Sequence, residues 1–330
     1  MRAQENSLLP HFEERVFGFW GIIPVSTGYG NVITPGRKRS MGENLQDRLS
    51  DIPLDSDAIR LFSDYLRITG VAHTEPEPKG DPRLIGKRLG LLNGASWITL
   101  WANYFGRLYL PGVHLVNVGN EAIQISFMQA HARGLPTPPA SNIEAFVRYA
   151  RDLVELAQVD AVLITCSTMN RSYPQVQEAL SPHDVPVMQI DRPMMTRAVK
   201  HGGRILVVAT HGPTVESTQR LLQETALQGN AEALNQEITF SGITVEHAWH
   251  CLANGDVEGH NEALAHAIRE TLAAGTAEQK EKIGCVVLAQ LSMTVFLLSY
   301  PDPVSEFGVP VFTSGQCGYE SMKELLVNGR

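Results

Sequence analysis

The stretch "DAVLITCSTMN" (residues 160–170) recurs without gaps as "GCVVLAQLSMT" (residues 284–294), 124 residues later. The tripeptide "VPV" repeats at the same offset, at 185–187 and 309–311. The apolar runs that begin at Arg88 and Arg204 also resemble each other, at an offset of 116. Matches at a shared offset indicate an internal repeat. The sequence therefore predicts a body made of two similar halves.

Short apolar runs of strand character alternate with helical patterns after residue 87, which is typical of parallel α/β units. The predicted strands are 88–94, 113–119, 160–166, 185–191, 204–210, 243–249, 285–291 and 309–315. One predicted helix, 142–157, follows a capping box of Ser141 and Glu144, and another begins after Asp256 and ends at Gly275. We expect an α/β fold of two pseudo-symmetric domains, each built on a parallel four-stranded sheet.

The predicted domain boundaries follow from this pattern. The first half spans 87–197 and the second spans 198–311, and we expect the segment 312–330 to pack on the first half. Residues 1–86 form an N-terminal extension, with a helical pattern around Ile59, Phe62 and Leu66. The Pro-, Gly- and charge-rich stretch "HTEPEPKGDP" (73–82) is typical of a connector.

Composition narrows the class of protein. The chain has 330 residues, of which 43% are hydrophobic, and no apolar run is long enough to span a bilayer. The first residues lack a secretory-signal pattern, so we expect a cytoplasmic protein that does not enter membranes. The net charge of −8 and the absence of a basic stripe argue against nucleic-acid binding. Four cysteines without CxxC or metal-finger spacing predict free thiols and no metal site.

The two halves predict where a ligand binds. Parallel sheets bind ligands beyond the carboxyl ends of their strands. Four segments end predicted strands and would converge on one cleft: Asn93–Ser96, Cys166–Asn170, Thr210–Thr214 and Gln290–Met293. Cys166 and Gln290 occupy equivalent positions in the repeat.

Cys166 is the candidate catalytic group. A thiol titrates at about 8.5, and we expect the backbone amides that follow Cys166 to favour the thiolate. A cysteine in a strand is also a common core residue, so packing is the competing interpretation. His211 is a candidate second acid/base group, although a histidine in a loop is often only solvated or hydrogen-bonded. Cys317 is a further candidate thiol, whereas Cys251 and Cys285 read as packing residues.

Polar groups around the cleft are suited to bind an anionic ligand. The amides of Ser167, Thr168 and Met169, and of Leu291, Ser292 and Met293 opposite, are expected to donate to such an anion. The predicted substrate-binding side chains are those of Asn93, Ser96, Ser167, Thr168, Thr210, Thr214, Gln290 and Ser292.

The ordered motifs "LITCSTMN", "VPVMQIDRPMMTRAVKHGGRILVVATHGPTVEST", "ANGDVEGH", "VVLAQLSM" and "PVFTSG" resemble the aspartate/glutamate/hydantoin racemase superfamily over residues 87–330. The match is to its branch with an "LAQxSM" second motif. This resemblance implies a cofactor-free enzyme, a small carboxylate-bearing substrate, a site between two α/β domains and a homo-oligomer. Two-base members of the family use one cysteine from each domain, and Cys166 matches the first of them.

Gln290 stands where the second cysteine of a two-base racemase would be, and an amide has no accessible pKa. Three hypotheses remain. The first is a one-cysteine isomerase, racemase-type enzyme, decarboxylase or lyase acting through an enediolate. The second is a two-lobed binding or regulatory protein without catalysis. The third, covalent thiol catalysis, lacks a cysteine–histidine signature. Nucleotide-binding motifs such as GxGxxG are absent, which argues against nicotinamide and nucleotide cofactors.

Overall fold

The computed structural model describes residues 80–228, 238–278 and 282–328, all of which belong to one unit, Leu61–Arg330. The helix predicted around Ile59, Phe62 and Leu66, and most of the predicted extension, lie outside the described residues. Of the helices in the described ranges, none combines the length and the apolar character that crossing a membrane requires.

The first half is built on a parallel four-stranded sheet in the order β2-β1-β3-β4. Its strands are β1 (Arg88–Asn93), β2 (His114–Gly119), β3 (Ala161–Ile164) and β4 (Val187–Gln189). Its helices are α3 (Ile98–Tyr109), α4 (Glu121–Ala132), α5 (Ala140–Ala157), η2 (Ser167–Ser172), α6 (Tyr173–Leu180), η3 (Ser181–His183) and α7 (Asp191–His201). The central strands β1 and β3 are almost entirely buried, as expected for strands covered on both faces.

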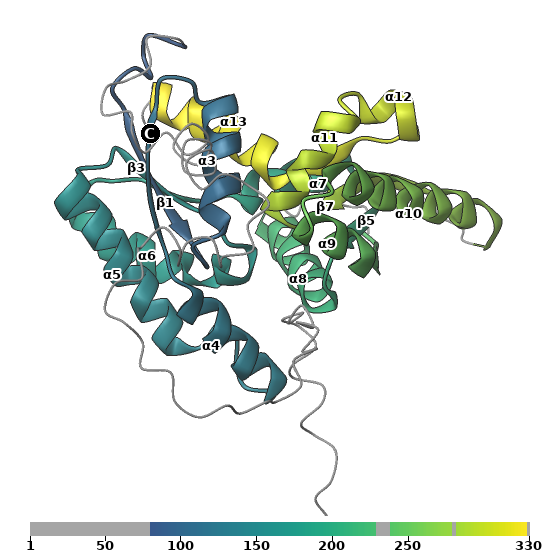
Figure 1. Cartoon of the computed structure of the whole chain (residues 1–330), viewed down its shortest axis with the longest axis horizontal. Helices are drawn as coiled ribbons and strands as arrows, with labels where there is room; N and C mark the ends of the chain where they lie inside the picture. Colours follow the sequence, from purple (N-terminus) through teal and green to yellow (C-terminus); the bar gives the residue numbers. More distant parts are fainter. Residues whose placement is uncertain (1–79, 229–237, 279–281, 329–330) are drawn as a thin grey trace, which may run out of the picture. The chain divides into compact units, whose positions relative to one another are not determined.

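The second half repeats this order as β6-β5-β7-β8, again all parallel. Its strands are β5 (Arg204–Ala209), β6 (Phe240–Thr244), β7 (Ile283–Leu288) and β8 (Val311–Thr313). Its helices are α8 (Gly212–Gln228), α9 (Glu246–Ala253), α10 (Val257–Glu278), η4 (Leu291–Val295), α11 (Phe296–Ser299), α12 (Pro303–Phe307) and α13 (Ser314–Asn328). Figure 1 shows the two sets of elements along the colour gradient.

The repeat seen in the sequence is present in the structure. Strands β4 and β8 begin at Val187 and Val311, which are 124 residues apart, and the 3-10 turns η2 and η4 begin at Ser167 and Leu291, again 124 apart. Strands β1 and β5 begin 116 residues apart, at Arg88 and Arg204. The predicted α/β fold with two similarly ordered parallel sheets is therefore confirmed.

Three local predictions are wrong. The stretch 243–249 is not one strand, because β6 ends at Thr244 and α9 begins at Glu246 and buries Ala248. Helix α5 begins at Ala140 after Pro139, and no side chain caps it, so the predicted capping box does not form. Helix α10 continues past Gly275 to Glu278, because a single glycine costs a helix only about 1 kcal/mol.

The C-terminal helix α13 follows the second sheet but packs against elements of the first half. Figure 1 shows α13, in yellow, beside α3, in dark blue. Tyr319 is fully buried in a cluster with Leu89 and Phe105, and its hydroxyl donates to the carbonyl of Ala102 at 2.7 Å. Helix α13 also contacts α7, where Arg197 pairs with Glu320 of α13 at 2.7 Å.

Candidate active site

Cys166 and Gln290 occupy equivalent places at the ends of equivalent strands. Each residue precedes a 3-10 turn and has extended backbone angles, φ −107° and ψ 113° for Cys166 and φ −127° and ψ 145° for Gln290. Each turn closes through the same bond, from the amide of Met169 to the carbonyl of Cys166 at 3.0 Å and from Met293 to Gln290 at 3.1 Å. The repeat thus builds two copies of one strand-end geometry.

These turn bonds change one expectation. The amides of Met169 and Met293 were predicted to bind a substrate anion, but both donate to carbonyls within their own turns. In a 3-10 turn each amide donates to the carbonyl three residues earlier, so the amides of Met169 and Met293 are already engaged and cannot bind a substrate anion. The binding roles of the earlier amides, from Ser167 and Thr168 on one side and Leu291 and Ser292 on the other, remain predictions.

The thiol of Cys166 is nearly buried, with 9% of the residue exposed. Its sulfur lies 3.2 Å from the hydroxyl oxygen of Thr168, and the space on its other side is left by Gly94, where a Cβ atom would stand 2.3 Å from the sulfur. Burial raises the pKa of Cys166 and outweighs the hydrogen bonds from Thr168 and from nearby amides, which lower it. The direction of this shift is opposite to the one expected from the sequence, and it favours the protonated thiol over the thiolate.

Gln290 is held by the second half itself. Its side-chain oxygen accepts hydrogen bonds from the amide of Thr210 at 2.8 Å and from the hydroxyl of Thr210 at 2.9 Å. These bonds link the ends of β7 and β5 and fix the glutamine amide in one orientation. Two of the predicted binding residues, Thr210 and Gln290, are therefore brought together.

A hydrogen bond joins the two strand ends. The hydroxyl of Ser167, next to Cys166, donates to the carbonyl of Ala289, next to Gln290, at 3.1 Å. The residues that follow β3 and β7 are thus in direct contact, as the convergence of loops predicts. This contact brings the segment of Cys166 to the segment of its counterpart.

Asn93 and Ser96 have partners within the first half. Asn93 is fully buried, and its amide nitrogen donates to Asn117 at 3.0 Å, while its oxygen accepts from the hydroxyl of Thr165. The backbone amide and the hydroxyl of Ser96 both bind the carboxylate of Glu121. In this structure these groups support the loop after β1.

The other predicted residues lie at the start of helical segments in the second half. Thr214, in the first turn of α8, and Ser292, in η4, are 7% and 5% exposed. His211 directly precedes α8, and burial lowers its pKa, so its imidazole is neutral at pH 7. The His211 ring lies 5.3 Å from the ring of Trp249, which in turn lies 5.8 Å from Trp97. An aromatic contact thus connects His211 with the segment that precedes α3 of the first half.

The remaining cysteines are free thiols, as predicted. Cys285 and Cys317 are buried in one apolar cluster of the second half. Cys251 is half-buried on α9, where its sulfur lies 3.6 Å from the ring of His247. Within the ranges that the structure covers, no group of three or more His, Cys, Asp or Glu side chains is placed to hold a metal ion.

Asp191 is a buried carboxyl group that the sequence analysis missed. It is 1% exposed at the first position of α7, and its carboxylate accepts a hydrogen bond from the side chain of Asn170, in the turn after Cys166. Gln189 clamps the same turn by donating to the carbonyl of Asn170 at 2.6 Å. Burial raises the pKa of Asp191 to about 7, against the lowering effect of bonds from Asn170, Ser167 and Ser314. The available signal was an acidic residue at the end of the predicted strand 185–191.

The raised pKa of Asp191 predicts a pH-dependent stability. Below about pH 3 the carboxyl is almost fully neutral in both the folded and the unfolded chain. As the pH rises towards 7 the unfolded chain ionises first, so the free energy of unfolding falls. Between about pH 5 and about pH 8, the free energy of unfolding of Asp191→Asn should therefore rise by roughly 2–4 kcal/mol relative to that of wild type. Urea unfolding at both pH values measures this gain.

Asp152→Asn is the matched control, because Asp152 is exposed on α5. For this variant, the difference in unfolding free energy between the two pH values should stay close to that of wild type. A difference in unfolding free energy between the two pH values that is the same for Asp191→Asn and Asp152→Asn would contradict the raised pKa of Asp191.

Comparisons with known proteins agree with this architecture. Residues 123–322, 200 of the 330 residues, match the family model described as Asp/Glu/Hydantoin racemase. The structure of an aspartate racemase homologue from Pyrococcus horikoshii aligns with a TM-score of 0.52 and 16% identity, covering 73% of this chain and 99% of that chain. This likeness shows the fold alone.

Two further solved structures align less well. Allantoin racemase from Klebsiella pneumoniae gives a TM-score of 0.48 and 19% identity, covering 74% of this chain and 89% of that chain. Glutamate racemase from Bacillus anthracis gives 0.47 and 19%, covering 74% and 83%. Among curated protein sequences, none matches the chain significantly.

Proposed function

Because the chain belongs to the Asp/Glu/hydantoin racemase family, we propose that it is a cofactor-independent enzyme that transfers a proton at the carbon alpha to a carboxylate. The proposed substrate is a small, amino-acid-like acid, in keeping with the family description. The observation that carries the proposal is the hydrogen bond from Ser167 to the carbonyl of Ala289, which joins the strand end of Cys166 to that of Gln290.

The proposed role of Cys166 is that of proton donor. A buried thiol is uncharged at neutral pH, so it can deliver a proton to a carbanion without first being protonated. The proton passes from sulfur to the alpha carbon, which restores a neutral carbon centre and leaves a thiolate. Water then returns a proton to the sulfur. Thr168, 3.2 Å from the sulfur, is placed to stabilise the thiolate during this step.

The proposed role of Gln290 is to bind the substrate, not to transfer a proton. Its oxygen is occupied by Thr210, so the group that it can offer a substrate is its N–H₂, a donor suited to a carboxylate or an enediolate oxygen. With one thiol, the chain is suited to reactions that need one protonation at carbon. Examples are isomerisation assisted by a second base, for which His211 is the candidate, and cleavage of a bond at the alpha carbon followed by protonation.

The test is incorporation of deuterium at the alpha carbon. The purified protein is incubated in D₂O with aspartate, glutamate, a 5-substituted hydantoin and a 2-substituted malonate. Each compound is followed by proton NMR against the same compound without protein. We expect loss of the alpha-proton signal, or a deuterated cleavage product, with at least one substrate class. Cys166→Ser should abolish it, whereas exchange that survives this substitution unchanged would remove Cys166 from the mechanism.

A further inference from the structure

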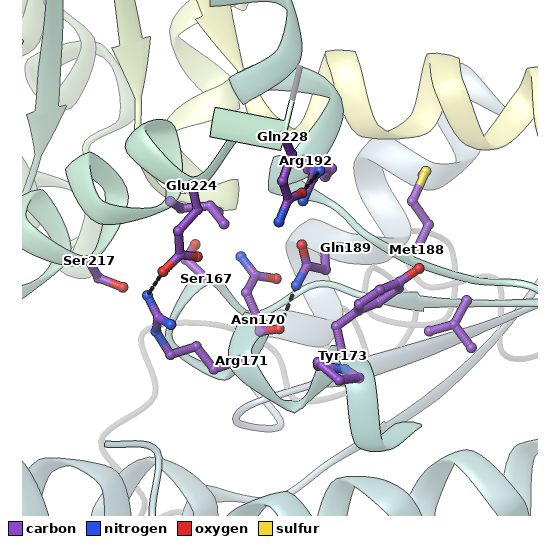
Figure 2. A pocket seen from close by; sticks show the side chains of 13 residues that line it. Ser167, Asn170, Arg171, Tyr173, Met188, Gln189, Arg192, Ser217, Glu224 and Gln228 are labelled. Atoms are coloured by element: carbon purple, nitrogen blue, oxygen red, sulfur yellow. Dashed lines mark hydrogen bonds and ion pairs between the residues drawn. The ribbon is translucent and has the colours of Figure 1, made fainter. Parts of the chain in front are cut away.

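A cavity of roughly 530 Å³ adjoins the turn η2. Its lining includes Ser167 and Asn170 of η2 but neither Cys166 nor Thr168. The opposite wall is helix α8, which contributes Leu221, Glu224 and Gln228, among others (Figure 2). This volume is within the range of small-molecule sites, about 300–1,000 Å³.

The cavity contains two arginines in different electrostatic situations. Arg171 pairs with the carboxylate of Glu224 at 2.8 Å, so its charge is balanced. Arg192 donates instead to the neutral side-chain oxygen of Gln228, and it has no acidic partner within the part of the chain that the structure describes. Figure 2 shows both side chains on the rim of the same space. Among the residues that the structure describes, Arg192 is therefore the arginine of this lining that forms no ion pair.

Apolar and aromatic residues are also part of the lining. Val187 and Met188 come from β4, Leu221 comes from α8, and the ring of Tyr173 comes from α6. A guanidinium group binds a carboxylate through two parallel hydrogen bonds, and the apolar wall suits a hydrocarbon or aromatic body. A ligand with both parts would satisfy the charge and cover the apolar surface.

We propose that this cavity is a second ligand site, which binds a small organic carboxylate with an apolar or aromatic body. Arg192 binds the carboxylate, and Tyr173 and Leu221 contact the body. The ligand touches η2, which begins immediately after Cys166, and α8 of the second half. A bound ligand therefore bridges the turn η2 and helix α8, and it should stabilise the folded chain.

The experiment uses phenylacetate as the charged probe and phenylacetamide as a neutral probe of the same shape. Binding to the full chain is measured by titration calorimetry and by the thermal unfolding midpoint at millimolar probe. We expect phenylacetate to bind at least about ten-fold more tightly than phenylacetamide and to raise the midpoint. Equal behaviour of the two probes, or no binding of either, would overturn the proposal.

Variants locate the binding. Arg192→Gln should weaken the binding of phenylacetate by about ten-fold or more and leave the affinity for phenylacetamide unchanged, because only the charge is lost. Leu221→Trp should weaken the binding of both probes by filling the cavity. Arg269→Gln is the matched control, since Arg269 lies on α10 and is paired with Glu306, and it should change neither affinity.

Phenylacetate that binds both Arg192→Gln and Leu221→Trp as it binds wild type would show that the probe occupies another place, and would overturn the assignment. Unfolding midpoints without probe show whether each variant is folded. No turnover is needed in these measurements. A chain that fails the deuterium test can therefore still confirm this site, and an active chain can still refute it.

Discussion

Cys166→Ala should lower the rate of proton transfer by about 10²- to 10⁴-fold and change the dissociation constant of the substrate by less than about three-fold. The physical reason is that alanine removes the S–H proton but leaves the shape of the turn, which is set by the bond from Met169 to the carbonyl of residue 166. Substrate contacts from Thr168, Ser292 and Gln290 are proposed to remain. The rate is measured by deuterium incorporation, and the affinity by calorimetry.

Cys251→Ser is the matched control for this substitution, because it removes another thiol, half-buried on α9, that has no proposed role. Its rate should stay within about two-fold of wild type. An unchanged affinity together with an undetectable rate in wild type would instead favour the alternative, a two-lobed binding protein that has the cleft without the chemistry. An unchanged rate in Cys166→Ala would exclude the thiol as donor.

Gly94→Ala should reduce the rate by at least about 10²-fold even though residue 94 has no chemical group to contribute. An alanine Cβ would stand 2.3 Å from the sulfur of Cys166 and 3.1 Å from its Cβ, so the thiol has to move out of its place. A displacement of this size in a reacting group is enough for such a loss. The chain should still fold, at a cost of roughly 1–3 kcal/mol from overpacking.

A double-mutant cycle separates the clash from other effects of this alanine. In a Cys166→Ala background the sulfur is gone, so Gly94→Ala should cost less unfolding free energy than it does in wild type. Gly212→Ala is the control, because the nearest heavy atom to a Cβ at that glycine is 3.9 Å away. Equal costs of Gly94→Ala in both backgrounds would contradict the predicted contact with the sulfur.

The fold was predictable because two independent regularities of the sequence agree. Apolar runs of strand length mark the buried strands of each sheet. The offset of 124 residues identifies β4 and β8 as equivalent strands of the two halves. Boundaries were less predictable. In "ITVEHAW" (243–249) a short run of strand character favoured a strand, but Ala248 is buried by packing against a distant part of the chain, which a local pattern does not contain.

The candidate site was predictable in position but not in electrostatics. Strand ends and the repeat were enough to place Cys166 and Gln290 at equivalent points. The direction of the pKa shift of Cys166 depends on how much protein surrounds the sulfur, and burial there outweighs the nearby donors. Asp191 was missed because its partner, Asn170, is 21 residues away and its counterpart in the repeat is Gly315, which has no side chain.

Helix α13 follows the second sheet in the sequence but packs against the first half, and this arrangement has a consequence for folding during synthesis. Tyr319, Met322 and Leu326 complete the apolar interior around β1, although β1 begins more than two hundred residues earlier, at Arg88. A ribosome makes β1 early and α13 late. The first sheet, whose last strand β4 ends at Gln189, therefore keeps an unfilled interior until α13 has been made. A nascent chain arrested before residue 314 should be captured by chaperones that bind exposed apolar surface.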